Sequence, residues 1–341
     1  MIGSASGWEG GGKMASPFWE ECLEKEPTIR LGVSTCLLGE NVRYDGGHKR
    51  DRFLTDTLGE FVDWVPVCPE VEIGLSTPRE AMHLEGDPEN PRLVTIKTGK
   101  DYTDRMKTWA QQRLDELAKR DLHGFVFKSR SPSSGLYRVK VYDEHGMPSR
   151  IGTGIFPSEV MRRFPLLPLE EDGRLHDMGL RENFIERIFA YYRWICMLER
   201  DPSPGGVVAF HTAHKLTMMA HSPDHYRRMG RLVAEAGVLP WPELVRRYGQ
   251  LLMEGLQVMG TRGKHTNVLK HLMGFLKEYL STEDKAELLG LIEDYYDGLV
   301  PLIVPLTLLK HQLNRYPVPD WAHQQVYLKP YPKELMLRNH V

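Results

Sequence analysis

Two cysteines in the first part of the chain are the residues whose type is best suited to chemistry. Cys36 and Cys68 each follow directly after a short apolar segment, whereas Cys22 and Cys196 stand in no comparable pattern. A thiolate can act as a nucleophile or bind a soft metal. The sequence has no CxxC pair and no Cys/His zinc pattern, so spacing alone leaves a metal site and buried apolar cysteines as open alternatives.

Three loops follow segments that we predict to be strands, at Arg30–Thr35, Val62–Val67 and Gly124–Phe127. The first loop carries Cys36, the second carries Cys68, and the third contains a Ser-Pro-Ser-Ser-Gly turn. In open α/β sheets, ligands bind outside the carboxyl ends of the strands. We therefore expect both cysteines and the turn to face one site. Turns rich in Gly and Pro also let backbone N–H groups approach a bound anion or inorganic sulfur closely.

The elements around these loops alternate between strands and helices. Further strands are predicted at Leu93–Lys97 and Leu136–Tyr142, and helices at Lys49–Phe61, Tyr102–Arg120 and Gly154–Phe164. Such alternation favours an α/β fold with a mostly parallel, doubly wound sheet.

After about residue 170 only helical patterns remain. The predicted helices are Arg181–Glu199, Val207–Ala220, Pro223–Ala236, Pro240–Met259, Lys264–Leu280, Thr282–Leu299 and Pro301–Tyr316. Ser222 before Pro223, and Ser281 before an acidic turn, mark helix starts. The proline-rich tail from Pro317 is expected to wrap over the helices. We therefore expect a flexible leader over 1–28, an α/β domain over 29–170 and an all-α helical domain over 171–341.

Composition and terminal sequence argue against export or membrane insertion. No apolar run approaches the ~18 residues that a membrane span needs, and Met1–Lys13 is rich in Gly and Ser without the pattern of a signal peptide. These features predict a cytoplasmic protein with no membrane partner. Its cysteines are then expected to stay reduced. The oligomeric state does not follow from the sequence.

The helical part carries a local excess of positive charge. Between His211 and Lys277 there are ten Lys and Arg against four Asp and Glu, with six histidines in the same stretch. Such groups contact RNA phosphates and 2′-hydroxyls. We expect tRNA contacts from His211, His214, Lys215, His221, Tyr226, Arg227, Lys264, His265, Asn267 and Lys270. The alternatives are a metal site at His211, His214 and His221, packing between helices, and an ordinary solvated surface.

Long motifs in the same loops resemble those of the thiouracil desulfidase family. Its signatures are SxCLLGxxVRYDG, VCPE…GL..PRE and SPSCG, which Ser34–Gly46, Val67–Glu80 and Ser131–Gly135 match in order. The helical part is similar to the domain fused to this one in tRNA 4-thiouridine desulfidases, through FHTAHKLTMMAHSP, KHTNVLKHLMGF and the final PLTLLKH…YLKPYPKELMLRNHV. Together the matches extend from Arg30 to Val341.

The resemblance implies a 4Fe–4S cluster held by three cysteines, with one iron left open. Cys36 and Cys68 occupy two ligand positions, but the third falls on Ser134. A serine alkoxide is a harder ligand than the thiolates that normally select such clusters. We interpret the chain either as a substituted form made to disable or trap the enzyme, which we favour, or as a natural variant with weaker cluster assembly.

The implied reaction is the non-redox removal of sulfur from 4-thiouridine in tRNA, which gives uridine and sulfide. The open iron would act as a Lewis acid toward the thiocarbonyl sulfur. Glu70 is the candidate general acid/base, and its alternative role is an ion pair with Arg79. Ser131 would position the base or the water, unless it is only a turn residue. Free thiouracil or thiouridine nucleosides as substrate, and a non-catalytic RNA-binding protein, are the competing hypotheses.

Overall fold

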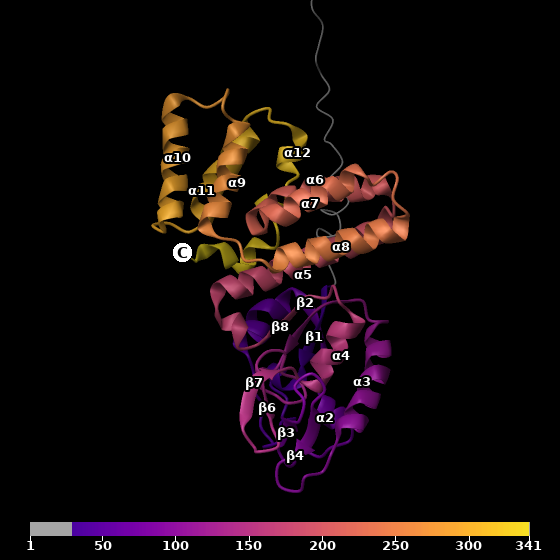
Figure 1. Cartoon of the computed structure of the whole chain (residues 1–341). Coiled ribbons are helices and arrows are strands. Elements are labelled where there is room, and N and C mark those ends of the chain that lie inside the picture. Colours follow the sequence, from indigo (N-terminus) through magenta and orange to yellow (C-terminus); the bar gives the residue numbers. More distant parts are fainter. Residues whose placement is uncertain (1–28, 341) are drawn as a thin grey trace, which may run out of the picture.

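The computed structural model describes residues 29–340. The predicted leader over 1–28, together with Cys22, lies outside the described residues. Figure 1 shows an α/β part below and a helical part above it. Within the described residues, no helix combines the length and the apolar character that crossing a membrane requires.

A four-stranded parallel sheet forms the centre of the α/β part. Its strands, in spatial order, are β2 (Val62–Val67), β1 (Ile29–Ser34), β5 (Leu122–Phe127) and β8 (Leu169–Glu171). All six residues of β5 are buried, as expected for a central parallel strand with both faces covered. Gly32 of β1 lies so close to the ring of Phe125 that a Cβ would overlap it, so the two strands can pack only with glycine there.

Helices cover both faces of this sheet. On one face, α3 (Thr103–Leu117) and α4 (Ile155–Arg163) share a core with Phe125 and Phe127. On the other face, the first half of α5 (Met178–Arg200) packs against apolar residues of β1, β2 and β5. The predicted fold class, a mostly parallel doubly wound sheet followed by helices, is therefore confirmed. The second covering layer comes from the first long helix of the helical part.

A second, mixed sheet lies beside the first and was not predicted. Its strands, in spatial order, are β4 (Arg92–Thr95), β3 (Met82–Glu85), β6 (Val139–Tyr142) and β7 (Pro148–Gly152). The segments predicted as strands near residues 93 and 140 therefore belong to this sheet. The predicted helix Lys49–Phe61 is confirmed only in part, since a π-helical turn (Phe53–Thr57) and a 3-10 turn (Leu58–Glu60) form there in place of an α-helix.

The predicted helices of the second part are all present, with ends displaced by a few residues. After α5 they are α6 (Pro204–His221), α7 (Pro223–Ala234), α8 (Trp241–Gln257), α9 (Arg262–Gly274), α10 (Thr282–Asp297) and α11 (Ile303–Arg315). The predicted starts are confirmed, because the Ser222 and Ser281 side chains accept N-terminal N–H groups of α7 and α10. The described tail packs over the helices as expected: Tyr327 is fully buried beside α9 and α11.

Candidate active site

The three motif loops meet around one cavity at the carboxyl ends of β1, β2 and β5. The cavity has a volume of about 470 Å³, and its wall includes Cys36, Cys68, Glu70, Ser131 and Ser134. Strand order explains this convergence. The chain passes from β1 to β2 on one side, and β5 lies on the other side of β1, so the sheet opens into a crevice there.

Local structure fixes each loop. Cys36 lies in a 3-10 turn (Thr35–Leu38) that begins directly after β1, and Cys68 is the N-cap residue of the short helix α2 (Pro69–Glu72). In the third loop, the N–H of Gly135 donates to the carbonyl oxygen of Ser131 at 2.7 Å. A Cβ on Gly135 would meet that oxygen at 2.7 Å, so the tight turn requires glycine.

Both cavity thiols are held in their neutral form by their surroundings. Burial raises the pKa of Cys36 to about 11. Burial, with a smaller contribution from the negative charge of Glu70, raises the pKa of Cys68 to about 12. A thiolate would therefore form at neutral pH only beside a strong positive charge such as a metal ion.

Glu70 is held from three sides. The Ser133 hydroxyl donates to Oε1, while Oε2 lies 3.7 Å from Nη2 of Arg79 and 3.6 Å from Sγ of Cys68. The ion pair with Arg79 that we considered as an alternative role is thus present, and Glu70 lines the cavity as well. The two roles are compatible, because one carboxylate can be held by Arg79 and still face a bound ligand.

Ser131 and Ser133 continue this polar chain. The Ser131 hydroxyl lies 2.9 Å from that of Ser133 and accepts the backbone N–H of Ser134 at 3.2 Å. Sequence reasoning missed Ser133. The only signal for it is its place between two serines in the third loop, and neither spacing nor residue type distinguishes it there.

Lys128, which lines the cavity, was missed as well. Its ammonium group donates to Asp172 at 2.8 Å and to the Ser129 hydroxyl at 2.9 Å. Burial alone would raise the pKa of Asp172, but the charge and hydrogen bond of Lys128 outweigh burial and hold that pKa below its usual value. The cavity therefore contains a paired cation close to Cys36.

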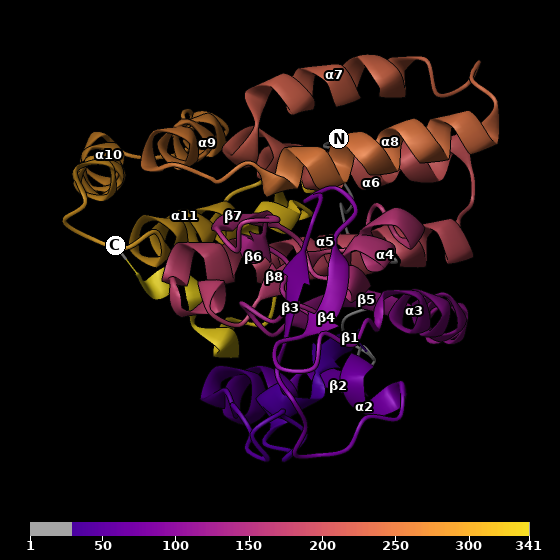
Figure 2. The same cartoon turned by 60° about the horizontal axis from the view of Figure 1, so that its bottom comes forward.

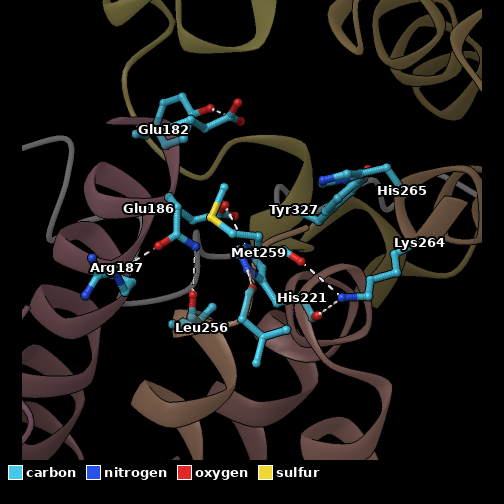
Figure 3. A network of polar contacts seen from close by, with 12 residues as sticks. Glu182, Glu186, Arg187, His221, Leu256, Met259, Lys264, His265 and Tyr327 are labelled. Atoms are coloured by element: carbon cyan, nitrogen blue, oxygen red, sulfur yellow. Dashed lines mark hydrogen bonds and ion pairs between the residues drawn. The ribbon is translucent and has the colours of Figure 1, made fainter. Parts of the chain in front are cut away.

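The structure corrects part of the predicted RNA-contact set. His214 and His221 are 1% and 3% exposed, so their side chains cannot reach RNA in this conformation. The His214 ring stacks on Phe210, while His221 lies 3.0 Å from Glu186 and 2.7 Å from the carbonyl oxygen of Val258 (Figure 3). Because both partners of His221 accept hydrogen bonds, both of its ring nitrogens must donate. This agrees with a pKa raised above its ordinary value: burial opposes the charged form, but Glu186 outweighs it.

Four more predicted RNA contacts are half-buried and pair within the protein. The rings of His211 and His265 approach tyrosine hydroxyls, at 3.3 Å from Tyr248 and 3.0 Å from Tyr327. Burial lowers the pKa of His211 to about 4 and that of His265 to about 3, so neither is cationic at neutral pH. The ammonium of Lys215 lies 3.5 Å from the centre of the Trp321 ring, and Lys264 donates to two carbonyl oxygens, at 2.7 and 3.0 Å (Figure 3).

The remaining predicted contacts lie at or near the surface. Arg227, Asn267 and Lys270 are exposed, and Tyr226 is half-buried against the core of α7 and α8. Further arginines are exposed on the same two helices, at Arg228, Arg231 and Arg246. Between residues 29 and 340, no three His, Cys, Asp or Glu side chains are grouped so as to hold a metal ion, and this applies to the histidine alternative as well.

A smaller cavity of about 200 Å³ lies between α5, α9 and the tail. Part of its charged wall is paired: Nε of Arg338 lies 3.4 Å from Glu182, and Nε2 of His340 lies 2.7 Å from the same carboxylate. These contacts attach the tail to α5.

Comparisons with known proteins divide the chain at the same place as its fold. Residues 31–172 match the family described as 2-thiouracil desulfurase, and residues 215–332 match DUF1722, described as a protein of unknown function. The chain is 31% identical over 156 residues to the uncharacterized protein YbgA of Escherichia coli. This match covers 45% of this chain and 90% of YbgA. It is also 30% identical over 108 residues to the uncharacterized protein YbbK of Bacillus subtilis. This match covers 30% of this chain and 71% of YbbK.

One solved structure is also similar. It is that of the [4Fe-4S]-dependent thiouracil desulfidase TudS, which is 28% identical to the matched part of this chain. The match covers 46% of this chain and 98% of TudS, with a TM-score of 0.36.

Proposed function

We propose that this chain, which belongs to the 2-thiouracil desulfurase family, removes sulfur from 4-thiouridine in tRNA and releases uridine and sulfide. The observation that carries the proposal is the single cavity bounded by the three family loops. It joins two thiols, a carboxylate and two serine hydroxyls in a space large enough for a cofactor and one nucleobase.

The donor set fits an iron–sulfur cluster with one substituted ligand. Cys36, Cys68 and Ser134 would hold it, because they enter the cavity from three separate loops. Both thiols lie in surroundings that disfavour a bare thiolate, which is the situation that metal binding relieves. When bound, such a cluster would supply an open iron that acts as a Lewis acid toward the sulfur of the base.

The protein's own groups would handle the base, the water and the protons. Glu70 is positioned to take a proton from an attacking water and to return one to the departing sulfur. Ser131 would accept a hydrogen bond from that water or from the base. Arg79 orients Glu70 from behind, and the exposed Tyr44 and Ile96 border the cavity where a base would enter.

Ser134 is expected to weaken the cofactor site. Its side chain is 4% exposed and its hydroxyl lies 3.4 Å from that of Ser133, so a hydroxyl stands where the family pattern has a sulfur. We infer that this chain assembles its cluster poorly and is impaired as an enzyme, whether the serine is natural or introduced.

An RNA substrate agrees with the charge of the helical part. The exposed arginines of α7 and α8 offer contacts to phosphate. Both views place these helices far from α2, which borders the cavity (Figures 1 and 2). A ligand that touched both regions would have to extend across the molecule, as a folded RNA does and a free nucleoside does not.

The test compares this chain with its Ser134→Cys variant after anaerobic cluster assembly. Incubation of the variant with thiolated tRNA should remove the near-ultraviolet absorption of 4-thiouridine and release sulfide. This chain should do so much more slowly. A band that persists with an intact cluster would rule out the substrate.

Free thiouracil is the second candidate substrate, because the cavity volume of about 470 Å³ suits a single base. The two substrates differ in their dependence on salt. Phosphate contacts release counterions, so turnover of tRNA at low concentration should fall steeply with salt, whereas turnover of the free base should change little.

A further inference from the structure

Ser133 lies behind the wall of the catalytic cavity and touches both polar groups to which we assign roles there. Its side chain is 0% exposed, and it does not line the cavity, whereas Glu70 and Ser131 do. It therefore cannot contact a substrate directly. Its hydroxyl nevertheless bridges the two groups that can.

The backbone of Ser133 is held firmly by the start of α4. Its carbonyl oxygen accepts the N–H of Phe156 at 3.0 Å, and a Cβ on Gly154 would meet the Ser133 carbonyl at 2.9 Å. These contacts hold the Ser133 backbone against the start of α4 and so fix the point from which its hydroxyl extends.

The direction of the hydrogen bonds follows from counting protons. The carboxylate of Glu70 can only accept, so the single hydroxyl proton of Ser133 is directed to it. The contact between the two hydroxyls must then be a bond from Ser131 to Ser133. Ser131 also accepts the N–H of Ser134, so its proton points away from the cavity and a lone pair remains for a ligand.

We propose that Ser133 is a positioning residue, which orients the Ser131 hydroxyl as an acceptor toward the cavity and holds the Glu70 carboxylate in place. The inference rests on the proposed function, because the reaction being served is desulfidation. It predicts that Ser133 affects the rate of the chemical step and leaves the binding of substrate nearly unchanged.

The experiment uses the full chain with Ser134→Cys as parent. Ser133→Ala should lower kcat about 100-fold while KM stays within about twofold, because oriented hydrogen bonds act on the reacting groups. Ser133→Thr, which keeps the hydroxyl, should recover most of this loss. Ser149→Ala is the matched control: its hydroxyl donates only to the carbonyl oxygen of Val141 in the second sheet.

Two further measurements separate positioning from damage. Iron and sulfide content should be equal in the parent and in Ser133→Ala, and a crystal structure of the cluster-free variant should show the Glu70 carboxylate or the Ser131 hydroxyl turned from its present place. A double variant with Ser131→Ala should be little slower than Ser131→Ala alone, since residues that act as one unit are not additive.

An unchanged kcat in Ser133→Ala, or multiplied losses in the double variant, would overturn the inference while leaving the proposed function intact. A parent that desulfurates neither thiolated tRNA nor thiouracil would instead remove the function, and the role of Ser133 with it. If Ser133→Ala and Ser133→Thr both lose their iron, the hydroxyl serves cofactor retention and the inference is wrong.

Discussion

The two parts of the molecule use buried and half-buried polar groups in opposite ways. In the α/β part, Glu70, Ser131 and Ser133 are joined to one another at the edge of a cavity, at the ends of strands. In the helical part, His214 and His221 are buried between helices and pair with backbone or carboxylate groups. The difference indicates that the polar residues on these loops at strand ends border a cavity, whereas the buried histidines on the helices hold the helices together.

The largest effect is expected when one partner of the buried His221–Glu186 pair in the helical part is removed. His221→Ala leaves Glu186 without its imidazolium, and breaking a buried ion pair costs about 3–5 kcal/mol of unfolding free energy. Urea unfolding should show this loss. His311→Ala, at an exposed position of α11, should change stability by less than about 0.5 kcal/mol. A small effect of His221→Ala would mean that the pair is not structural.

The corresponding test in the α/β part removes the carboxylate of the cavity. In the Ser134→Cys parent, Glu70→Gln should lower kcat about 100-fold, since general acid–base groups contribute at least that much. Glu116→Gln, on an exposed part of α3, should leave turnover unchanged. Steady-state sulfide release measures both. Equal activity of Glu70→Gln and the parent would exclude Glu70 from proton transfer.

Acid should destabilise the helical part more than the α/β part. Burial lowers the pKa of His211 to about 4 and the pKa values of His214 and His265 to about 3, whereas only His123 is lowered in this way, to about 4, in the described α/β part. Unfolded histidines titrate near 6.5, so below that pH the unfolded state binds more protons and stability falls as pH falls. Each such histidine should cost about 1 kcal/mol of stability over the first pH unit below 6.5. The helical part, with three, should therefore lose about 2 kcal/mol more than the α/β part, with one.

Hydrogen exchange of each part at pH 7 and pH 5.5 measures this difference. The amides of α6 and α9 should lose protection, while those of β1 and β5 should change less. His214→Leu should reduce the acid sensitivity of the helical part, because one buried site that resists protonation is removed. Equal loss of protection in both parts would contradict the conclusion that the buried histidines make the helical part the more acid-sensitive one.

The smallest expected effect concerns RNA affinity. Replacing Arg227 and Arg231 of α7 by alanine should weaken tRNA binding about tenfold at low salt. The slope of log affinity against log salt concentration should become shallower by about two, because two phosphate contacts are lost. The matched control replaces Arg162 and Arg163, which are exposed on α4. Fluorescence anisotropy over a salt series measures both pairs. Equal losses in the two pairs would show that α7 has no special role.

The accuracy of the sequence predictions follows the same division. The loops that carry Cys36 and Cys68 could be placed because each follows an apolar strand, and parallel strands bring their carboxyl ends to one edge. The helices were predicted because their apolar periodicity and caps are local properties. The strands of the second sheet are short: β3 and β7 have four and five residues with partly exposed side chains, and little local signal marks them.

Side-chain direction was the main error. His214 and His221 lie on the same helix as the exposed Val208, and helical spacing alone does not say which face of that helix is covered. That depends on which neighbours pack there, which is tertiary information. Ser133 was missed for a related reason, because only the folded loop shows which of three serines turns inward.

The helix α5 belongs to two cores at once. Phe184, Ile185 and Ile188 pack beneath the parallel sheet, whereas Trp194 and Met197 pack among the helices. Truncation after residue 172, where the family match ends, would expose the apolar face of the sheet that α5 covers to solvent. A truncated protein that contains only the α/β part should therefore end within α5. It should keep the turns that carry Phe184, Ile185 and Ile188, and any aromatic residue of the later turns that becomes exposed, such as Trp194, should be replaced.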